Sequence, residues 1–212
     1  MLGYGQTNIA VIYSQLLKSL TCISTVEEFI TFIKTIIWID DLDLQLVLSR
    51  CTERQVPKGK IILRKGQIAS QYFFIVSGGV RFFYTLNDQE NTTWVTFKNE
   101  FFTEISSLNP QKPTRFNIEA IEDTKLVVID KKDMDFLYSH IAVWEEFGRK
   151  VWEAMSVRMI DQILNFQTLT AEERYLEFMN NPEFLQKVPV KQLAAVLGIT
   201  PNALSRIRKN IR

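Results

Sequence analysis

The chain of 212 residues carries 25 Lys and Arg, 24 Asp and Glu, and one histidine, so its formal net charge is +1. A single histidine and two widely separated cysteines, Cys22 and Cys51, exclude a His-rich metal centre, a Cys-x-x-Cys zinc site and a four-thiolate iron–sulfur site. Aromatic residues make up 12%, too many for a disordered chain, and no apolar run reaches the ~18–20 residues of a membrane span.

Residues 1–24 show no clear hydrophobic period and stay unassigned. Polar residues interrupt their apolar stretches and no Lys or Arg precedes these, so the segment makes a poor signal peptide. We therefore expect a cytoplasmic protein with no membrane partner, in which Cys22 and Cys51 are reduced and idle.

Residues 25–50 are expected to form two helices. Thr25 is a candidate N-cap with Glu28 three residues on, as in a capping box, and apolar residues follow at helical spacing. The second helix is expected over residues 40–49. Its inward-facing side is expected to consist of Leu42, Leu46 and Val47.

From about Lys58 the hydrophobic period changes to two, which predicts β-strands. Turn signals such as Lys58-Gly59 and Ser77-Gly78-Gly79 separate short runs rich in β-branched and aromatic residues. Strand starts roughly 8–12 residues apart are typical of an antiparallel sandwich or barrel. The expected strands are Ile61–Leu63, Tyr72–Val76, Val80–Tyr84, Thr92–Phe97, Phe116–Ile121 and Leu126–Ile129.

One interval in this strand pattern is longer than the others. Residues 98–115 contain two prolines, Pro110 and Pro113, and do not form a hairpin. A long insertion in a compact sheet is often a binding segment.

Residues 133–166 are expected to return to helix. The apolar positions recur at steps of four, with one final step of three; they are Val143, Phe147, Val151, Met155, Met159, Ile163 and Phe166. A small β-domain cannot cover so long a stripe, so a second copy of the helix is expected to cover its exposed part. The expected dimer seam consists of Phe147, Val151, Met155 and Met159. Packing against the protein's own sheets is the alternative.

A smaller helix is expected after Leu169, with Thr170 as its N-cap and Glu173 as its capping-box partner. The C-terminal segment VPVKQLAAVLGITPNALSRIRKNIR then predicts a helix-turn-helix. Gly198 supplies the positive φ that ends the helix of residues 190–197, Thr200 caps the next helix and Pro201 occupies its first position. The positions expected to face inward are Leu193, Ala194, Leu197, Leu204 and Ile207.

The charge of this segment distinguishes it from a generic helix pair. Between Val188 and Arg212 there are five basic residues and no acidic one, so the rest of the chain is net acidic. A generic pair of packed helices gives the same inward pattern, but it need not place basic residues alone on the outer face of its second helix. The residues expected to contact DNA are Lys191, Thr200, Asn202, Ser205, Arg206, Arg208 and Lys209.

A sandwich, a long helix and a helix-turn-helix in this order resemble the Crp–Fnr family of transcription regulators over roughly residues 25–212. The resemblance is carried by Lys58-Gly59, the run FFIVSGGVRFFY at 73–84, the run IEAIEDTKLVVID at 118–130 and the run LGITPNALSRIRK at 197–209. It is strongest toward the short members that stop after the recognition helix.

The resemblance implies an α+β protein. Residues 25–140 would form an antiparallel β jelly roll of the cyclic-nucleotide-binding type with flanking helices. Residues 141–167 would form a dimerisation helix, and residues 168–212 an all-α helix-turn-helix domain.

The resemblance also places the family's functional residues on this chain. Its phosphate-binding cassette falls in the long insertion, where the Gly-Glu pair matches Thr103-Glu104. Its phosphate-binding Arg falls on Thr114, with Arg115 one place later, where an extended segment reverses the side-chain direction. We therefore expect no tight binding of cyclic AMP or GMP, and a pocket that is empty, filled by side chains or used for another small ligand.

In the recognition helix, Arg206 falls on a base-contacting Arg of the family. Pro201 and Asn202 replace the Arg and Glu that read bases in its best-known members, so the DNA site should differ from theirs.

The expected function is a homodimeric, sequence-specific transcription regulator and not an enzyme. Its expected partners are a near-palindromic double-stranded DNA site and a second copy of the chain, with RNA polymerase as a further candidate. No metal or certain cofactor is expected, and a small-molecule or nucleotide effector is left open. One alternative is a cyclic-nucleotide-binding regulatory protein that acts on a protein partner. Another is a jelly-roll enzyme, which no nucleophile–base or metal constellation supports.

Overall fold

The structure is a computed structural model that describes residues 26–180 and 182–211. The unassigned segment 1–24, Cys22 and the expected N-cap Thr25 lie outside the described residues.

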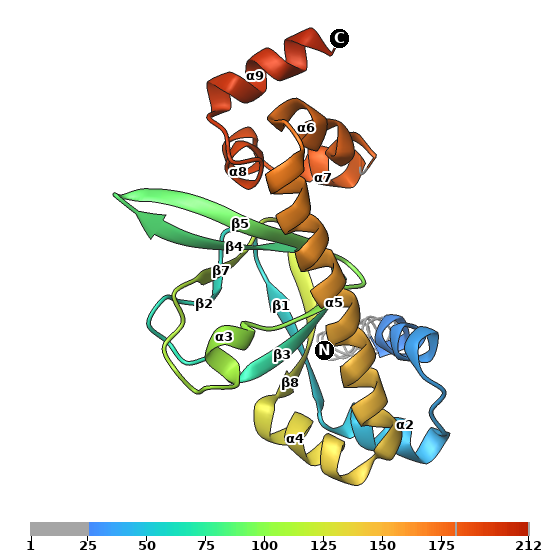
Figure 1. The fold of residues 1–212 in the computed structure, drawn as a ribbon. Coiled ribbons are helices and arrows are strands. Elements are labelled where there is room, and N and C mark those ends of the chain that lie inside the picture. Colours follow the sequence, from blue (N-terminus) through green and yellow to red (C-terminus); the bar gives the residue numbers. More distant parts are fainter. Residues whose placement is uncertain (1–25, 181, 212) are drawn as a thin grey trace, which may run out of the picture.

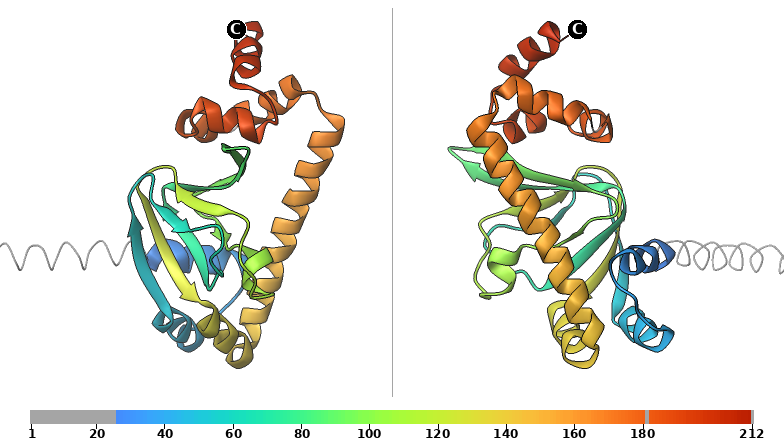
Figure 2. Two further views of the ribbon diagram at one scale, coloured as in Figure 1. Left: turned by 90° about the vertical axis from the view of Figure 1, so that its left-hand side faces the viewer. Right: turned by 45° about the vertical axis from the view of Figure 1, so that its right-hand side comes forward.

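Two four-stranded antiparallel sheets pack face to face as a jelly roll (Figures 1 and 2). The first sheet has the order β1-β8-β3-β6 and the second the order β2-β7-β4-β5. The strands are β1 Cys51–Val56, β2 Ile61–Leu63, β3 Gln71–Ser77, β4 Gly79–Leu86, β5 Gln89–Phe97, β6 Phe101–Phe102, β7 Asn117–Ala120 and β8 Thr124–Asp130.

 Figures 1 and 2 also show the long helix α5, Ala142–Thr168, which runs past the jelly roll to the C-terminal helices.

The six strands expected from the sequence are all present, and they correspond to β2, β3, β4, β5, β7 and β8. Two further strands were not expected. The first, β1, has the polar sequence CTERQV and lies at a sheet edge beside β8, so its apolar alternation is weak. The second, β6, is only two residues long and lies inside the long insertion.

The tight β3–β4 connection depends on Gly78. Its φ is 92°, and a Cβ there would lie 2.5 Å from Oγ1 of Thr124. Only glycine therefore fits this turn, which brings β4 beside β5 and β7 in the second sheet.

Apolar side chains between the two sheets form one core cluster, and helices cover the outside of the first sheet. These helices are residues 26–36, α2 Asp41–Ser49, α4 Lys131–His140 and the first turns of α5 Ala142–Thr168. Phe29, Phe74 and Trp144 are fully buried there. The orientation expected for α2 was partly wrong, because Leu42 is 80% exposed while Leu44 and Val47 are buried. Leu42 and Leu44 are two residues apart, which places them on different faces of a helix.

The expected helix of residues 133–166 is in fact two helices. Ile141 has extended backbone angles and separates α4 from α5. Helix α5 then leaves the jelly roll and leads to α6 Ala171–Met179, α7 Pro182–Lys187, α8 Val190–Val196 and α9 Pro201–Asn210. The capping box expected at Thr170 and Glu173 is confirmed at the start of α6.

The apolar stripe of α5 winds around the helix, and this corrects one seam residue. A step of four residues advances about 40° around an α-helix, so Phe147 and Met159 differ by about 120°. Phe147 is fully buried in its own chain, where its ring stacks on Trp144, whereas Met159 is 52% exposed. Phe147 thus belongs to the core and cannot line a seam between two copies. Val151 and Met155 are half-buried.

The apolar face that α5 leaves exposed lies nearer its C-terminal end. We call this the free face of α5; it consists of Val157, Met159, Ile160, Ile163 and Leu164, which are 48–58% exposed.

Candidate functional site

Helices α8 and α9 cross over a shared core and are joined by a short turn. Leu193, Ala194, Leu197 and Leu204 are fully buried, as the sequence pattern predicts. Gly198 has a φ of 71°, and a Cβ there would lie 3.1 Å from Cε1 of Phe166. The turn therefore needs glycine both for its backbone angle and for its close approach to the end of α5.

The start of α9 is capped as expected. Thr200 Oγ1 accepts a hydrogen bond from the backbone N–H of Ala203 at 3.2 Å, and Pro201 occupies the first turn. This fixes the direction in which α9 leaves the turn, and with it the face that α9 exposes.

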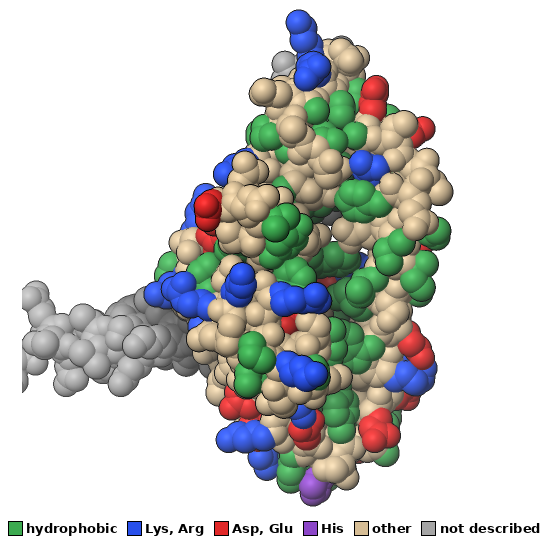
Figure 3. Space-filling model, turned by 60° about the vertical axis from the view of Figure 1, so that its left-hand side comes forward, with side chains coloured by type: hydrophobic (Ala, Val, Ile, Leu, Met, Phe, Trp, Pro, Cys, Tyr) green, Lys and Arg blue, Asp and Glu red, His purple; other side chains and the backbone are tan. Residues whose placement is uncertain are grey.

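The outer face of α9 is basic. Asn202, Ser205, Arg206 and Lys209 are exposed, and α9 contains no acidic residue. Arg206 and Lys209 make no ion pair with the described residues. Figure 3 shows basic side chains at the tip of the molecule, where α9 lies. The helix thus presents two unpaired cations and two short polar side chains to solvent.

The other residues in the expected DNA-contacting set differ in their surroundings. Lys191 is exposed in the first turn of α8. Arg208 is half-buried, and its guanidinium lies 5.7 Å from the centre of the Tyr175 ring on α6. Its Nε is buried without a hydrogen-bond partner among the described residues. Arg208 therefore makes a cation–π contact between α9 and α6 in addition to adding positive charge.

The long insertion forms the second candidate site. It contains β6 and the short helix α3 Ile105–Leu108. Glu104, only 5% exposed, caps α3: its Oε1 accepts hydrogen bonds from Ser106 N at 3.2 Å and Ser106 Oγ at 2.6 Å. Its Oε2 is buried and has no hydrogen-bond partner in the part of the chain that the structure describes. Thr103 Oγ1 donates to the carbonyl of Gln71 at 2.7 Å.

The two positions expected for a phosphate-binding side chain lie in different environments. Thr114 is 3% exposed, and its Oγ1 accepts a hydrogen bond from Phe116 N at 3.0 Å. Arg115 is exposed and makes no ion pair with the described residues. Arg81, the buried arginine of the jelly roll, binds Glu119, Glu90 and Thr92. Within the described residues, then, the buried guanidinium of the jelly roll, that of Arg81, already has carboxylate partners, and the unpaired Arg115 is exposed.

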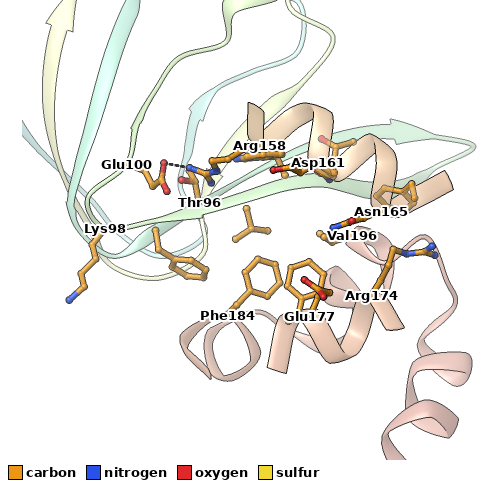
Figure 4. A pocket seen from close by; sticks show the side chains of 17 residues that line it. Thr96, Lys98, Glu100, Arg158, Asp161, Asn165, Arg174, Glu177, Phe184 and Val196 are labelled. Carbon is orange, nitrogen blue, oxygen red and sulfur yellow. Dashed lines mark hydrogen bonds and ion pairs between the residues drawn. The ribbon is translucent and has the colours of Figure 1, made fainter. Parts of the chain in front are cut away.

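Two features of the structure were not predicted from the sequence. One is a cavity of about 470 Å³ between β5, α5 and the C-terminal helices (Figure 4). Its residues are far apart in the sequence, so no local motif reveals it. The other is the free face of α5, whose members Val157, Ile160 and Leu164 are spaced by three and four residues. This spacing is typical of one apolar helix face, but the longer series of apolar residues spaced by four, from Val143 to Ile163, suggests a different face.

Burial raises the pKa of the Cys51 thiol to about 12, and the nearby Asp133 carboxylate contributes in the same direction.

Among the described residues, no three His, Cys, Asp or Glu side chains gather as metal ligands. No described helix is both long and apolar enough to cross a membrane.

Comparisons with known proteins identify the fold of this arrangement. Residues 53–140 match the family model of the cyclic nucleotide-binding domain. A curated relative, the cyclic AMP receptor protein of Thermus thermophilus, is 33% identical over 92 residues; the match covers 43% of this chain and 42% of the relative. The matched segment is thus less than half of that relative's length.

Solved structures match over a larger share of the chain. FixK2 from Bradyrhizobium japonicum is 20% identical with a TM-score of 0.62, covering 76% of this chain and 84% of its own. A putative transcriptional regulator of the crp/fnr family from Eubacterium rectale is 16% identical with a TM-score of 0.64, covering 81% of this chain and 83% of its own. The expected fold class, a jelly roll of the cyclic-nucleotide-binding type with flanking and C-terminal helices, is confirmed.

Proposed function

We propose that this protein is a homodimeric, sequence-specific DNA-binding transcription regulator of the Crp–Fnr type. The observation that carries the proposal is the outer face of α9, where exposed Arg206 and Lys209 have no acidic neighbour on the helix. The matched fold supports it, since a structure described as a putative transcriptional regulator of the crp/fnr family shares the fold over 81% of this chain. The protein would act in the cytoplasm, with DNA and RNA polymerase as partners.

In this proposal α8 and α9 are the helix-turn-helix and α9 enters the major groove. Base edges are then met by the N-terminal part of α9, including Asn202 and Ser205. Arg206 is the base reader, because a guanidinium can bond both acceptors of a guanine. Lys191, Arg208 and Lys209 bind phosphates, which adds affinity without choosing a sequence. Thr200 positions the helix through its cap.

Dimerisation uses the free face of α5. Its apolar side chains are about half exposed, so covering each of them by a second copy contributes roughly 1 kcal/mol, half of the full-burial value. A parallel pair of α5 helices places two α9 helices on one side of the dimer and related by a two-fold axis. The bound site is then a near-palindrome with half-sites one helical turn apart or a multiple of it.

The jelly-roll pocket in this protein binds neither cyclic AMP nor cyclic GMP tightly. A buried phosphate needs a guanidinium and several N–H donors, and the buried guanidinium of the described jelly roll, that of Arg81, already has carboxylate partners. Thr103 and Glu104 make local hydrogen bonds, Thr114 binds its own turn and Arg115 is exposed. Any effector is therefore of another kind.

Selection of bound sequences from a random double-stranded library tests the DNA proposal. We expect enrichment of one near-palindromic site, and loss of that enrichment in Arg206→Ala. If the wild-type protein binds no DNA at low salt, the proposal is wrong. The alternative would then be a regulatory protein that acts on a protein partner through its cyclic-nucleotide-binding-type fold.

A further inference from the structure

One arginine on α6 contacts the C-terminal ends of two other helices. The guanidinium of Arg174 donates to the carbonyl oxygen of Leu169 at 2.6 Å and to that of Leu197 at 2.9 Å. Leu169 is the C-cap of α5, and Leu197 is the C-cap of α8. Carbonyl groups at the end of a helix have no partner within the helix and carry partial negative charge. A single cation therefore stabilises both helix ends at once.

The ring of Phe166, in the last turn of α5, packs against the same arginine. The central carbon of the Arg174 guanidinium lies 4.7 Å from the centre of this ring, which is within cation–π distance. The ring also contacts the turn between α8 and α9, because a Cβ at Gly198 would lie 3.1 Å from its Cε1 atom. We call this group the Arg174 cluster; it consists of Phe166, Leu169, Arg174, Leu197 and Gly198.

The Arg174 cluster includes the start of the turn that leads into α9. Leu197 and Gly198 begin this turn, and Thr200, two residues further on, caps α9. Leu197 and Leu204 are fully buried in one core cluster, so α9 is packed firmly on α8. A shift of the turn relative to α5 would therefore move α9 with it.

The contacts of Arg174 require a guanidinium. Its Nη1 and Nη2 atoms bind two different carbonyl oxygens while the flat face of the group lies over an aromatic ring. Its Nε is buried without a hydrogen-bond partner among the described residues, so these two bonds hold the group in place. The ammonium group of lysine is a point charge without a flat face and cannot make all three contacts together.

We infer that Arg174 is a positioning residue that holds α9 at a fixed angle to α5 and thereby sets the half-site spacing that the dimer accepts. This inference rests on the proposed function, in which α5 supplies the dimer seam and α9 reads DNA. The distance between the two α9 helices of a dimer depends on the angle between α5 and α9, so a rigid connection selects one spacing. Arg174 acts through the turn and not by contact with DNA.

Duplexes that carry the selected half-sites at different spacings test the inference. One inserted base pair rotates one half-site relative to the other by roughly 34° and moves it by roughly 3.4 Å. We expect the wild type to bind its selected spacing at least about tenfold more tightly than spacings one base pair longer or shorter. In Arg174→Met this preference should fall to about threefold or less, with unchanged affinity for a single half-site. A preserved preference would overturn the inference. So would an equal loss of affinity for the half-site and for every spacing, because that result shows only damage to α8 and α9.

Matched variants separate the position of Arg174 from its charge. Arg174→Lys keeps the charge, and its preference for one spacing should fall as in Arg174→Met. Phe166→Leu removes the ring beneath the guanidinium at a position that is 42% exposed, and it should lower the preference by a smaller factor. Arg149→Met removes an exposed guanidinium roughly 25 Å away along α5 and should leave the preference unchanged. If Arg174→Lys retains the full preference, or Arg149→Met loses it, charge alone is responsible and the inference is wrong.

Distances between spin labels test the position of α9 without DNA. Labels at Ala154→Cys on α5 and Asn210→Cys on α9, both exposed positions, report the distance between the two helices in a chain with Cys22→Ser and Cys51→Ala. An excess of unlabelled cysteine-free chains leaves one labelled chain in each dimer. We expect one narrow distance distribution with Arg174 and a broader one in Arg174→Met.

Equal widths of the two distributions would overturn the inference. If the wild type binds no DNA at low salt, the proposed function fails together with the statement about half-site spacing. The spin-label distances then still decide whether Arg174 orients α9 relative to α5.

Discussion

The ring of Phe97 on β5 packs edge-on against the ring of Phe184 on α7, with the two centroids 5.9 Å apart. Lys187 of α7 forms an ion pair with Glu122 at 2.9 Å beside this contact. Phe97, Val95 and Ile121 thereby share a core cluster with the C-terminal helices. The C-terminal helices are therefore attached to the rest of the molecule in two ways, through the end of α5 and through direct contacts with the jelly roll.

Phe97→Ala should loosen this attachment. Truncating a buried Phe costs about 3–5 kcal/mol, and here most of the loss falls on the junction. We expect calorimetry to show the C-terminal helices unfolding in a separate transition at lower temperature. Phe82→Ala, which removes a ring packed on Phe102 inside the jelly roll, should lower the main transition without splitting it. A single unchanged transition in Phe97→Ala would contradict the role of this contact.

Ile160→Asp should convert the dimer to monomers. Ile160 is 56% exposed on the free face of α5, and an acid there would be buried without a partner in the seam. Ala154→Asp is the matched control, since Ala154 is exposed and lies about 120° around the same helix. Sedimentation at micromolar concentration measures both. A monomeric wild type, or equal dissociation by Ala154→Asp, would refute the seam.

Arg206→Ala and Lys209→Ala should weaken DNA binding in different ways. Loss of the base reader removes about 1–3 kcal/mol of discrimination and relaxes sequence choice at one position. Loss of a phosphate contact lowers affinity for all sequences and reduces the salt slope by about one. Binding to specific and random DNA over a range of salt concentrations distinguishes the two. Equal losses on both DNAs in Arg206→Ala would show that Arg206 does not read bases.

Calorimetry with cyclic AMP and cyclic GMP should detect no tight binding of either. Arg115 is the cation that a phosphate could recruit, and it is exposed one residue past the buried Thr114. Micromolar binding that Arg115→Ala abolishes would show that the segment rearranges around the nucleotide and would reject the proposal of a degenerate pocket.

The Cys51 thiol should resist alkylation near pH 8 in the folded protein. Burial raises its pKa to about 12, so almost none of it is the reactive thiolate. Mass spectrometry of the Cys51 peptide should show slow labelling that becomes fast in denaturant. Rapid labelling of the native protein would contradict the burial of this side chain.

The same shift in the pKa of Cys51 makes stability depend on alkaline pH. The unfolded chain releases the thiol proton near its ordinary pKa of 9.0, whereas burial in the folded chain raises this pKa to about 12. The contribution to stability is therefore complete below about pH 9 and is lost as the pH rises toward 12. Denaturant midpoints of wild type and Cys51→Ala should converge over this range, because alanine does not titrate.

Local patterns in the sequence were sufficient for most of the strands and for the ends of α6, α8 and α9. Alternation over Phe73–Tyr84, the capping box at Thr170, and Gly198 with Thr200 and Pro201 each act within a few residues, so their effect needs no distant partner. The same patterns indicated the basic outer face of α9, because the side-chain directions of a helix follow from its period.

Only the tertiary structure decided which apolar residues of α5 remain exposed to solvent and which are buried in the core. Residues four apart advance about 40° around the helix, so the stripe passes from Phe147 in the core to Met159 and Ile163 on the exposed face. The cavity containing Asp161, Glu177 and Thr96 was likewise invisible in the sequence, since its walls come from strands and helices that meet only after folding. Short-range hydrogen bonding and periodicity determine the elements, whereas burial and the pairing of charges depend on which distant surfaces come into contact.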